Sequence, residues 1–154
     1  MKILKAAQSD LREILSLQYL AFQSEAVILN NPDIPPLKQT LADLQDEFNK
    51  QIFLKVVDDN GSIVGSVRYY SAGDTVYIGK LIVNPEFQGR GIGTNLLLEV
   101  EKLCTNKRYE LFTRKDNLKN ISLYTRIGYK IFGEKSITEN LSFAFLEKFA
   151  SPPT

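Results

Sequence analysis

The segment from Val83 to Thr94, VNPEFQGRGIGT, constrains the fold of this chain more than any other stretch. It follows an apolar run, has glycine at alternate positions, and leads into a helix-forming sequence. Backbone N–H groups at a helix N-terminus lack partners within the helix and carry the positive end of its dipole, and glycine lets an anion approach them closely. The segment therefore predicts a strand, a turn and a helix arranged to bind a phosphate group.

The spacing of these glycines argues against two common nucleotide motifs. A dinucleotide-binding turn needs G-x-G-x-x-G, but its third glycine position is taken by Thr94 in one register and by Leu96 in the other. A P-loop needs glycine and then lysine five and six residues after its first glycine, and Thr94 stands five residues after Gly89. NAD and ATP are therefore disfavoured as ligands of this turn.

What remains is the pattern Gln88-x-x-Gly91-x-Gly93, directly after an apolar strand end. This pattern resembles the acetyl-CoA pyrophosphate loop of the GNAT superfamily of N-acetyltransferases, whose motif is (R/Q)-x-x-G-x-(G/A). The resemblance implies acetyl-CoA as cosubstrate, without a metal. It also implies a set of cofactor contacts along the strand end and the loop: Leu81, Ile82, Val83, Gln88, Gly89, Arg90, Gly91, Ile92, Gly93 and Thr94.

A second informative segment, NLKNISLYTRIGY, runs from Asn117 to Tyr129. Asn117 and Tyr124 lie nearly two helical turns apart, so their side chains share one face and could touch one extended ligand. An Asn cap and a Tyr at the edge of the core would explain the same residues without any ligand, and these residues alone leave both interpretations open.

The segment is nevertheless similar to a second GNAT motif, N-x-x-(A/x)-x-x-x-Y-x-x-x-G-(F/Y). This similarity implies that Asn117 contacts the pantetheine or phosphate part of the cofactor and that the Tyr124 hydroxyl lies near the thioester sulfur. A tyrosine with a reference pKa of about 10 could protonate a thiolate with a reference pKa of about 8.5, so Tyr124 is the predicted general acid. The backbone N–H of Val83 is the predicted oxyanion contact.

The general base is left open by the sequence. The chain has no histidine, and its strand 75–83, where many GNAT members carry a glutamate, contains Lys80 as its only charged residue. Glu86, beside the loop, is expected to be solvated. Glu25 and Asp33, near the loop that precedes the second helix, could contact an amine or an ordered water.

Size and composition set further bounds. The chain has 154 residues, 44% of them hydrophobic, which predicts a single domain over residues 1–150 with a frayed tail at 151–154. Its single cysteine, Cys104, excludes an intrachain disulfide and is expected in the core.

No apolar run approaches the roughly 20 residues of a membrane span, and the absence of a secretory signal pattern predicts a cytoplasmic protein. A net charge of +1 argues against nucleic acid or a membrane as partner.

Hydrophobic periodicity predicts the element order β-α-α-β-β-β-α-β-α-β-β. The expected strands cover residues 1–6, 52–58, 62–71, 75–83, 109–113, 129–133 and 141–148. The expected helices have apolar faces at Leu11, Ile14, Leu15, Leu17 and Leu20, at Leu37, Leu41, Leu44 and Phe48, and at Ile92, Leu96, Leu97, Val100 and Leu103, with a fourth helix over 117–127; Asn106 and Gly128 are expected to end the last two.

We therefore expect an α/β (α+β) fold with a mixed, mostly antiparallel twisted sheet of about seven strands, with four helices. The same element order is that of the GNAT fold, so the resemblance covers most of the chain.

These observations predict an acetyl-CoA-dependent N-acetyltransferase that acts by direct transfer to a primary amine in a ternary complex. A small amine is favoured over a peptide N-terminus, and Tyr69, Tyr70, Phe143 and Phe145 could line its pocket, although aromatic residues in strands are more often core. The alternatives are a non-catalytic CoA-binding regulatory module and a nucleotide-binding domain with unrelated chemistry. An exposed final strand could support a homodimer.

Overall fold

The computed structural model describes residues 1–105 and 107–150, and for Ile28 only the backbone. The predicted helix cap at Asn106 and the predicted frayed tail at 151–154 lie outside the described residues.

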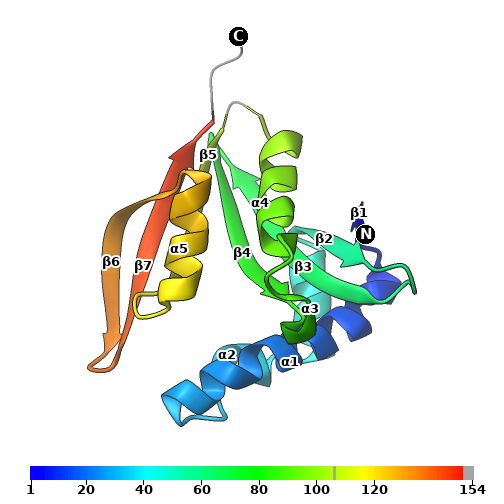
Figure 1. Cartoon of the computed structure of the whole chain (residues 1–154), viewed down its shortest axis with the longest axis horizontal. Coiled ribbons are helices and arrows are strands. Elements are labelled where there is room, and N and C mark those ends of the chain that lie inside the picture. Colours follow the sequence, from blue (N-terminus) through cyan, green and yellow to red (C-terminus); the bar gives the residue numbers. More distant parts are fainter. Residues whose placement is uncertain (106, 151–154) are drawn as a thin grey trace. The chain divides into compact units, whose positions relative to one another are not determined.

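The described elements follow the predicted order, with one additional short helix (Figure 1). They are β1 (Lys2–Lys5), α1 (Leu11–Leu29), α2 (Pro35–Lys38), α3 (Leu41–Phe48), β2 (Ile52–Val57), β3 (Ile63–Ala72), β4 (Thr75–Val83), α4 (Ile92–Leu103), β5 (Arg108–Arg114), α5 (Leu118–Ile127), β6 (Lys130–Thr138) and β7 (Leu141–Phe149). Short 3-10 turns cover Gln8–Asp10 and Pro85–Phe87. The predicted fold class is confirmed. The predicted count of four helices is wrong, because the second expected helix, with apolar positions from Leu37 to Phe48, is divided: Leu37 lies in α2, which already begins at Pro35 in the expected loop, and α3 begins at Leu41.

The strands form one sheet in the order β1-β2-β3-β4-β5-β7-β6. β4 and β5 pair in parallel, as the crossover through α4 requires, and the pairs β1–β2, β5–β7 and β6–β7 are antiparallel. β7 therefore lies between β5 and β6, although it follows β6 in the chain. The sheet is mostly antiparallel, as predicted.

The chain divides into two compact units. The first comprises Met1–Arg68 and Lys80–Leu97, and the second comprises Tyr69–Gly79 and Leu98–Thr154. The single domain expected over residues 1–150 stays a prediction.

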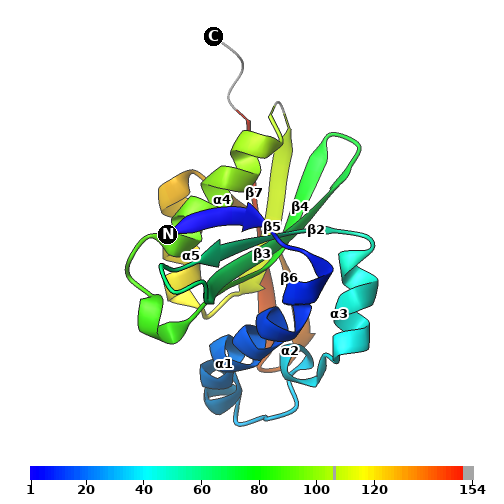
Figure 2. The ribbon, with the colours of Figure 1, turned by 90° about the vertical axis from the view of Figure 1, so that its right-hand side faces the viewer.

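The core of the first unit is formed mainly by apolar side chains of α1 and α3 packed on strands of the sheet. Leu11, Ile14, Leu44 and Phe53 are fully buried there. Figures 1 and 2 both show α2 and α3 lying beside α1. Leu20 of α1, expected in the apolar stripe, is instead exposed, because it follows Leu11 by about two and a half helical turns and so lies on the opposite side of the helix.

Gly65 of β3 lets α4 approach the sheet in this unit. A Cβ at this position would come within 2.9 Å of a side-chain carbon of Ile92 and 3.4 Å of one of Leu96. Close packing of the first turns of α4 on the strand therefore depends on the absence of a side chain at residue 65, and this packing fixes where the helix begins.

The second unit is organised around Tyr109 of β5. This tyrosine is 1% exposed, and its hydroxyl donates to the carbonyl oxygens of Cys104 at 2.6 Å and of Glu101 at 3.2 Å. The C-terminal end of α4 is thereby held on β5, since its last carbonyls would otherwise lack partners. Leu103, expected to pack inward, is exposed at this end of the helix.

Helix α5 begins and ends as the sequence predicts. The Asn117 side chain accepts a hydrogen bond from the Asn120 N–H at 3.1 Å, which satisfies one free donor of the first turn. Gly128 ends the helix with a left-handed backbone, φ 111°. The two boundaries fix the position of Tyr124 on the helix.

Candidate active site

The glycine loop between β4 and α4 has the backbone geometry of an anion-binding turn. Gly89 and Gly91 have φ values of 79° and 80°, in the left-handed region, and a Cβ on either would meet no other atom within 4 Å. The Asn95 N–H donates to the Gly91 carbonyl at 2.9 Å, so the N–H groups of the residues before Asn95 precede the hydrogen-bonded turns of α4. A pyrophosphate fits this loop, because the loop offers backbone donors, the positive end of a helix and open space.

Two of the predicted cofactor contacts can only be made through the backbone. The side chains of Ile82 and Ile92 are 3% and 5% exposed and pack in the core. Leu81, Val83, Gly93 and Thr94 are half-buried, whereas Gln88, Gly89, Arg90 and Gly91 are exposed. The Arg90 guanidinium lies over the Phe87 ring, 4.8 Å from its centroid.

Asn117 and Tyr124, in the second unit, both have structural partners within that unit. Asn117 is the N-cap of α5. Tyr124 is 5% exposed, and its ring centroid lies 6.2 Å from that of Tyr129. Burial raises the pKa of Tyr124 to about 12, so its phenol stays protonated at neutral pH. The cap-and-core interpretation of these residues is thus visible in the structure, and the cofactor contact stays a prediction.

Each group of predicted residues is brought together within one unit. The strand end and the glycine loop belong to the first unit, and Asn117 and Tyr124 belong to the second. Cys104 is half-buried, and burial raises the pKa of its thiol, in agreement with a structural role.

The remaining predicted residues are divided between the two units: the three carboxylates lie in the first unit, and the four aromatic residues lie in the second. Glu25 is half-buried, whereas Asp33 and Glu86 are exposed. Tyr69 is buried, and Tyr70 stacks on Tyr77 with ring centroids 5.2 Å apart. Phe143 and Phe145 pack on Phe112 at 5.1 and 5.5 Å. Tyr70, Phe143 and Phe145 therefore each have an aromatic partner within the second unit.

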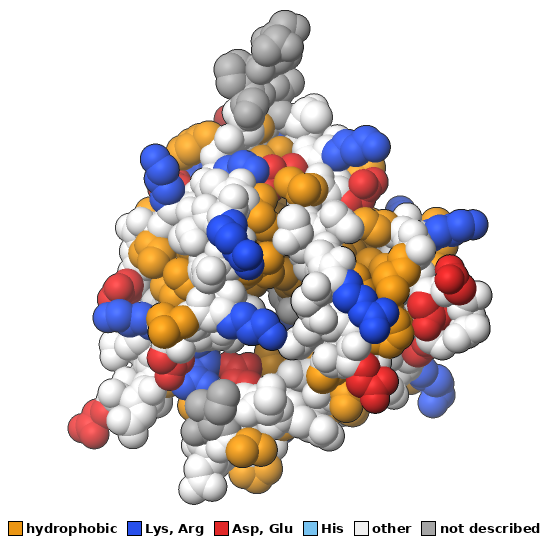
Figure 3. All heavy atoms as spheres, in the orientation of Figure 1, with side chains coloured by type: hydrophobic (Ala, Val, Ile, Leu, Met, Phe, Trp, Pro, Cys, Tyr) orange, Lys and Arg blue, Asp and Glu red, His pale blue; other side chains and the backbone are white. Residues whose placement is uncertain are grey.

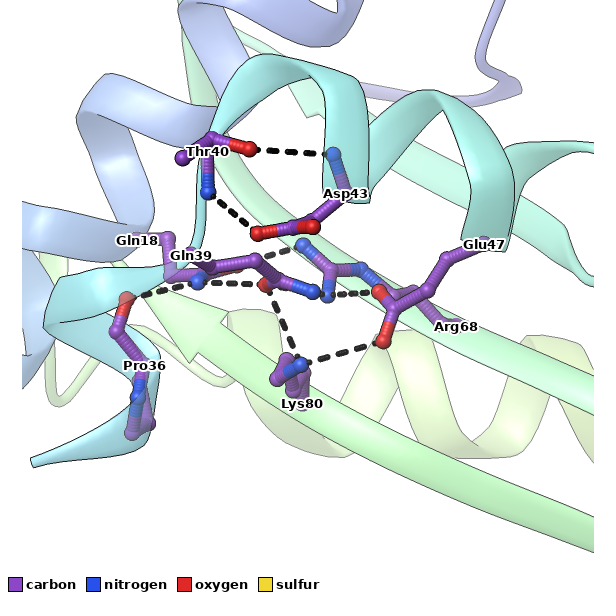
Figure 4. A network of polar contacts seen from close by, with 8 residues as sticks. All are labelled: Gln18, Pro36, Gln39, Thr40, Asp43, Glu47, Arg68 and Lys80. Carbon is purple, nitrogen blue, oxygen red and sulfur yellow. Dashed lines mark hydrogen bonds and ion pairs between the residues drawn. The ribbon is translucent and has the colours of Figure 1, made fainter.

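A polar network in the first unit was missed by the sequence reasoning. It consists of Gln18 on α1, Gln39 before α3, Glu47 on α3, Arg68 on β3 and Lys80 on β4 (Figure 4). The signals for it in the sequence are single charged residues inside two strands, Arg68 in strand 63–72 and Lys80 in strand 75–83.

Arg68 is the buried centre of the polar network. It is 2% exposed, and its guanidinium donates to Glu47 Oε2 at 2.7 Å and to Gln18 Oε1 at 2.5 Å, while it lies 4.7 Å from the Phe53 ring centroid. Burial lowers the pKa of Arg68 to about 10, and Glu47 opposes that shift. The guanidinium remains charged at neutral pH and is compensated by the carboxylate.

Lys80 forms the outer side of the polar network. Its ammonium donates to Gln39 Oε1 at 3.1 Å and to Glu47 Oε1 at 3.3 Å. Its backbone has φ 44°, a left-handed conformation that residues with side chains rarely adopt within a strand. Such strain is concentrated at functional sites in proteins, which makes this position of β4 a candidate for contact with a substrate.

Comparison with known proteins identifies the family. A model described as the acetyltransferase (GNAT) family matches residues 10–129. The chain therefore belongs to the GNAT acetyltransferase family, whose members use acetyl-CoA as cosubstrate. The family and the cosubstrate predicted from the two sequence motifs are confirmed.

Individual relatives are distant. The UPF0157 protein YqkA of Bacillus subtilis (strain 168) is 28% identical over 120 residues, which cover 77% of this chain and 34% of that protein. The chain thus spans about a third of the length of this curated relative.

Solved structures show the same fold. The PaiA N-acetyltransferase from Thermoplasma acidophilum, crystallised in complex with coenzyme A, has a TM-score of 0.78 and 18% identity over 96% of this chain and 98% of that chain. A GNAT superfamily phosphinothricin acetyltransferase from Sinorhizobium meliloti, in complex with AcCoA, has a TM-score of 0.76 and 20% identity over 99% of this chain and 92% of that chain. At these identities the likeness establishes the fold alone.

Three further features of the molecule are its surface charges, its helices and its possible metal ligands. On the face seen in Figure 3, the Lys and Arg side chains are interspersed with Asp and Glu side chains. No helix in the described part of the chain has both the length and the apolar composition needed to cross a membrane. Within residues 1–105 and 107–150, no three His, Cys, Asp or Glu side chains gather as a metal site would require.

Proposed function

We propose that this chain is an acetyl-CoA-dependent N-acetyltransferase that transfers an acetyl group to a primary amine by direct attack in a ternary complex. The observation that carries the proposal is the pair of left-handed glycines, Gly89 and Gly91, immediately before the N-terminus of α4. Two solved relatives of the same fold, crystallised with coenzyme A and with AcCoA, support it.

The cofactor would be held by backbone groups of the loop from Gln88 to Thr94, with Asn117 contacting its pantetheine or phosphate part. Bound acetyl-CoA supplies the activated acetyl group. The backbone N–H of Val83, at the end of β4, would donate to the carbonyl oxygen that becomes negative during attack.

Tyr124 would donate to the sulfur of the departing thiolate. A phenol with a pKa of about 12 gives up its proton reluctantly to a thiolate whose reference pKa is about 8.5. The burial that raises the pKa of the phenol also raises the pKa of a thiol in the same surroundings, which reduces this mismatch. Tyr124 is thus proposed as general acid through a hydrogen bond that strengthens as the sulfur becomes negative.

The acceptor is proposed to be a small amine rather than a peptide N-terminus. The relative named as a phosphinothricin acetyltransferase supports a small molecule. The proposal includes a cytoplasmic location and a homodimer. The final strand was expected to be exposed, and this expectation is wrong, because β7 pairs with β5 on one side and with β6 on the other and has no free edge for a partner.

A specific observation favours a second candidate, a non-catalytic module that binds CoA. The strand β4 carries Lys80 and no carboxylate, so the base used by many members of the family is missing from it. Such a module would bind acetyl-CoA and regulate another protein.

A measurement of turnover distinguishes the N-acetyltransferase from the non-catalytic module. We would incubate the protein with acetyl-CoA and a panel of primary amines, polyamines, amino acids and short peptides, and measure thiol release. Turnover with at least one amine supports the enzyme. Acetyl-CoA binding by calorimetry without turnover on the whole panel would favour the module, and absence of binding would refute both.

A further inference from the structure

The polar network is short of hydrogen-bond acceptors. Gln39 Oε1 receives three donors, Gln18 Nε2 at 2.8 Å, Lys80 Nζ at 3.1 Å and Arg68 NH1 at 3.4 Å, although a carbonyl oxygen has two lone pairs. The Lys80 ammonium has three N–H groups and contacts two acceptors, both beyond 3 Å. An additional anionic acceptor would complete this site.

The charges of the polar network also favour binding of an additional anion. Arg68 and Lys80 share a single carboxylate, with Glu47 Oε2 facing Arg68 and Oε1 facing Lys80. Asp43, about one turn before Glu47 on α3, is exposed and accepts from the Thr40 N–H at 2.9 Å, where it caps the helix, and it acts on Lys80 only through its charge. Burial and the neighbouring Arg68 lower the pKa of Lys80, and a bound anion would relieve that cost.

The position of Lys80 suits a substrate rather than a purely structural contact. Figure 4 shows Lys80 reaching from β4 toward Gln39 and Glu47, at the outer side of the buried Arg68. Its side chain is 28% exposed, whereas that of Arg68 is 2% exposed. Lys80 precedes Val83, the proposed oxyanion contact, by three residues of the same strand, and three residues span at most about 10 Å.

We propose that Lys80, supported by Gln39 and Glu47, binds the carboxylate of the acceptor, so that the acceptor is an amino acid or another amine that carries a carboxylate on a short carbon chain. This assignment deepens the proposed function and rests on it. Arg68 acts through Glu47 as a positioning residue, because it holds the carboxylate that orients the ammonium.

The test compares matched acceptors on the whole chain. Amino carboxylates of increasing length, from glycine to 6-aminohexanoate, are compared with their primary amides, by thiol release and by calorimetry on protein saturated with CoA. We expect the wild type to favour the carboxylates over the amides by about ten- to a hundredfold in kcat/KM and in affinity.

The substitution Lys80→Gln should reduce this preference to about one, with the change mainly in KM, and Lys80→Arg should restore part of it. The matched control is Lys55→Gln, which removes a partly buried lysine of the same unit whose ammonium lies 2.8 Å from Asp10 and should leave the preference unchanged. Thermal unfolding of each variant establishes that the comparison is made on folded protein.

Each outcome separates this proposal from the proposed function. Equal use of carboxylates and amides by the wild type, or a preference that survives Lys80→Gln, overturns the carboxylate site while acetyl transfer stands. If no amine is acetylated, the proposed function fails, and calorimetry still decides whether Lys80 binds amino carboxylates. A loss of CoA affinity in Lys80→Gln with the preference intact would assign the charge to the cofactor phosphates and overturn the proposal.

Discussion

Arg68 NH1 donates to Glu47 Oε2 at 2.7 Å, and this contact joins a fully buried guanidinium on β3 to a carboxylate near the C-terminal end of α3. The pair therefore links the sheet to α3. The side chain of Leu44, on the same helix, is buried in the core. The pair is therefore both an electrostatic contact and the attachment of α3.

Replacing Glu47 with glutamine should destabilise the protein. The buried Arg68 would lose its charged partner, and a hydrogen bond to a charged group contributes about 2 kcal/mol to the free energy of unfolding. Urea denaturation at neutral pH measures the loss. The control is Asp46→Asn, an exposed position on the same helix, where a change within about 0.5 kcal/mol is expected. Equal effects of the two substitutions would contradict the role of the pair.

Acid should weaken the contribution of Asp10. Burial raises the pKa of Asp10, but the hydrogen bonds from Lys55 and from the Ala7 backbone outweigh it, so the pKa lies below its ordinary value. A depressed pKa in the folded state contributes stability that is complete above the unfolded-state pKa of about 4 and is lost as pH falls through the folded-state value.

Asp10→Asn should therefore be less stable than the wild type near about pH 6, and the difference should shrink as the pH falls below about 4. Chemical denaturation over this range measures it. The control is Asp59→Asn, in an exposed turn, where a change in stability within about 0.5 kcal/mol is expected at neutral pH. A gap between wild type and Asp10→Asn that widens in acid would refute the assignment.

Gly91→Ala should weaken acetyl-CoA binding by at least about tenfold, since a side chain in the left-handed loop displaces the backbone from the phosphate. Calorimetry measures the affinity. The matched control is Gly61→Ala, whose glycine has the same φ of 80° and the same open surroundings but lies in the turn between β2 and β3.

Both glycine substitutions carry a similar backbone strain of about 1–2 kcal/mol, so their stabilities should fall together. Only the loop substitution should affect the cofactor. Comparable losses of affinity in both would attribute the effect to stability alone.

Tyr124→Phe should lower kcat by about a hundredfold with little change in acetyl-CoA affinity, because the hydroxyl is needed only when the thiolate leaves. Steady-state kinetics with the best acceptor and calorimetry provide the two readouts. Tyr109→Phe should show the opposite pattern, a loss of about 1 kcal/mol of stability with kcat retained, since its hydroxyl donates to the Cys104 carbonyl at 2.6 Å. Unchanged turnover in Tyr124→Phe would remove Tyr124 from the chemistry.

Local patterns in the sequence were sufficient for most of the elements. The bounds of β4 were predicted at Thr75 and Val83, and Asn117 and Gly128 were predicted at the ends of α5, because capping and turn residues act on their immediate neighbours. Helix α2 was missed as a separate helix. Its two prolines were read as part of a loop, although they occupy the first helical positions, where proline is tolerated, and Leu37 was assigned to the helix that follows.

The polar network could not be predicted in the same way. Its members come from α1, α3, β3, β4 and the segment before α3, so only the folded chain brings them together. The positions of the glutamine and lysine residues in the sequence follow no periodic pattern that would show which residues they contact. For the cofactor site, the two sequence motifs were sufficient to predict the family and the cosubstrate. The acceptor depends on side chains that are far apart in the sequence and belong to no short motif.

The position of β7 has a consequence for synthesis of the protein. β7 pairs with β5 on one side and with β6 on the other, yet of the seven strands it is the last to leave the ribosome. Until then β6 has no neighbour in the sheet and β5 lacks one of its two. The second unit must therefore complete its sheet in a single late step. A message that ends before Leu141 would release a chain in which β6 is unpaired and β5 has one open edge, and both could pair with other chains.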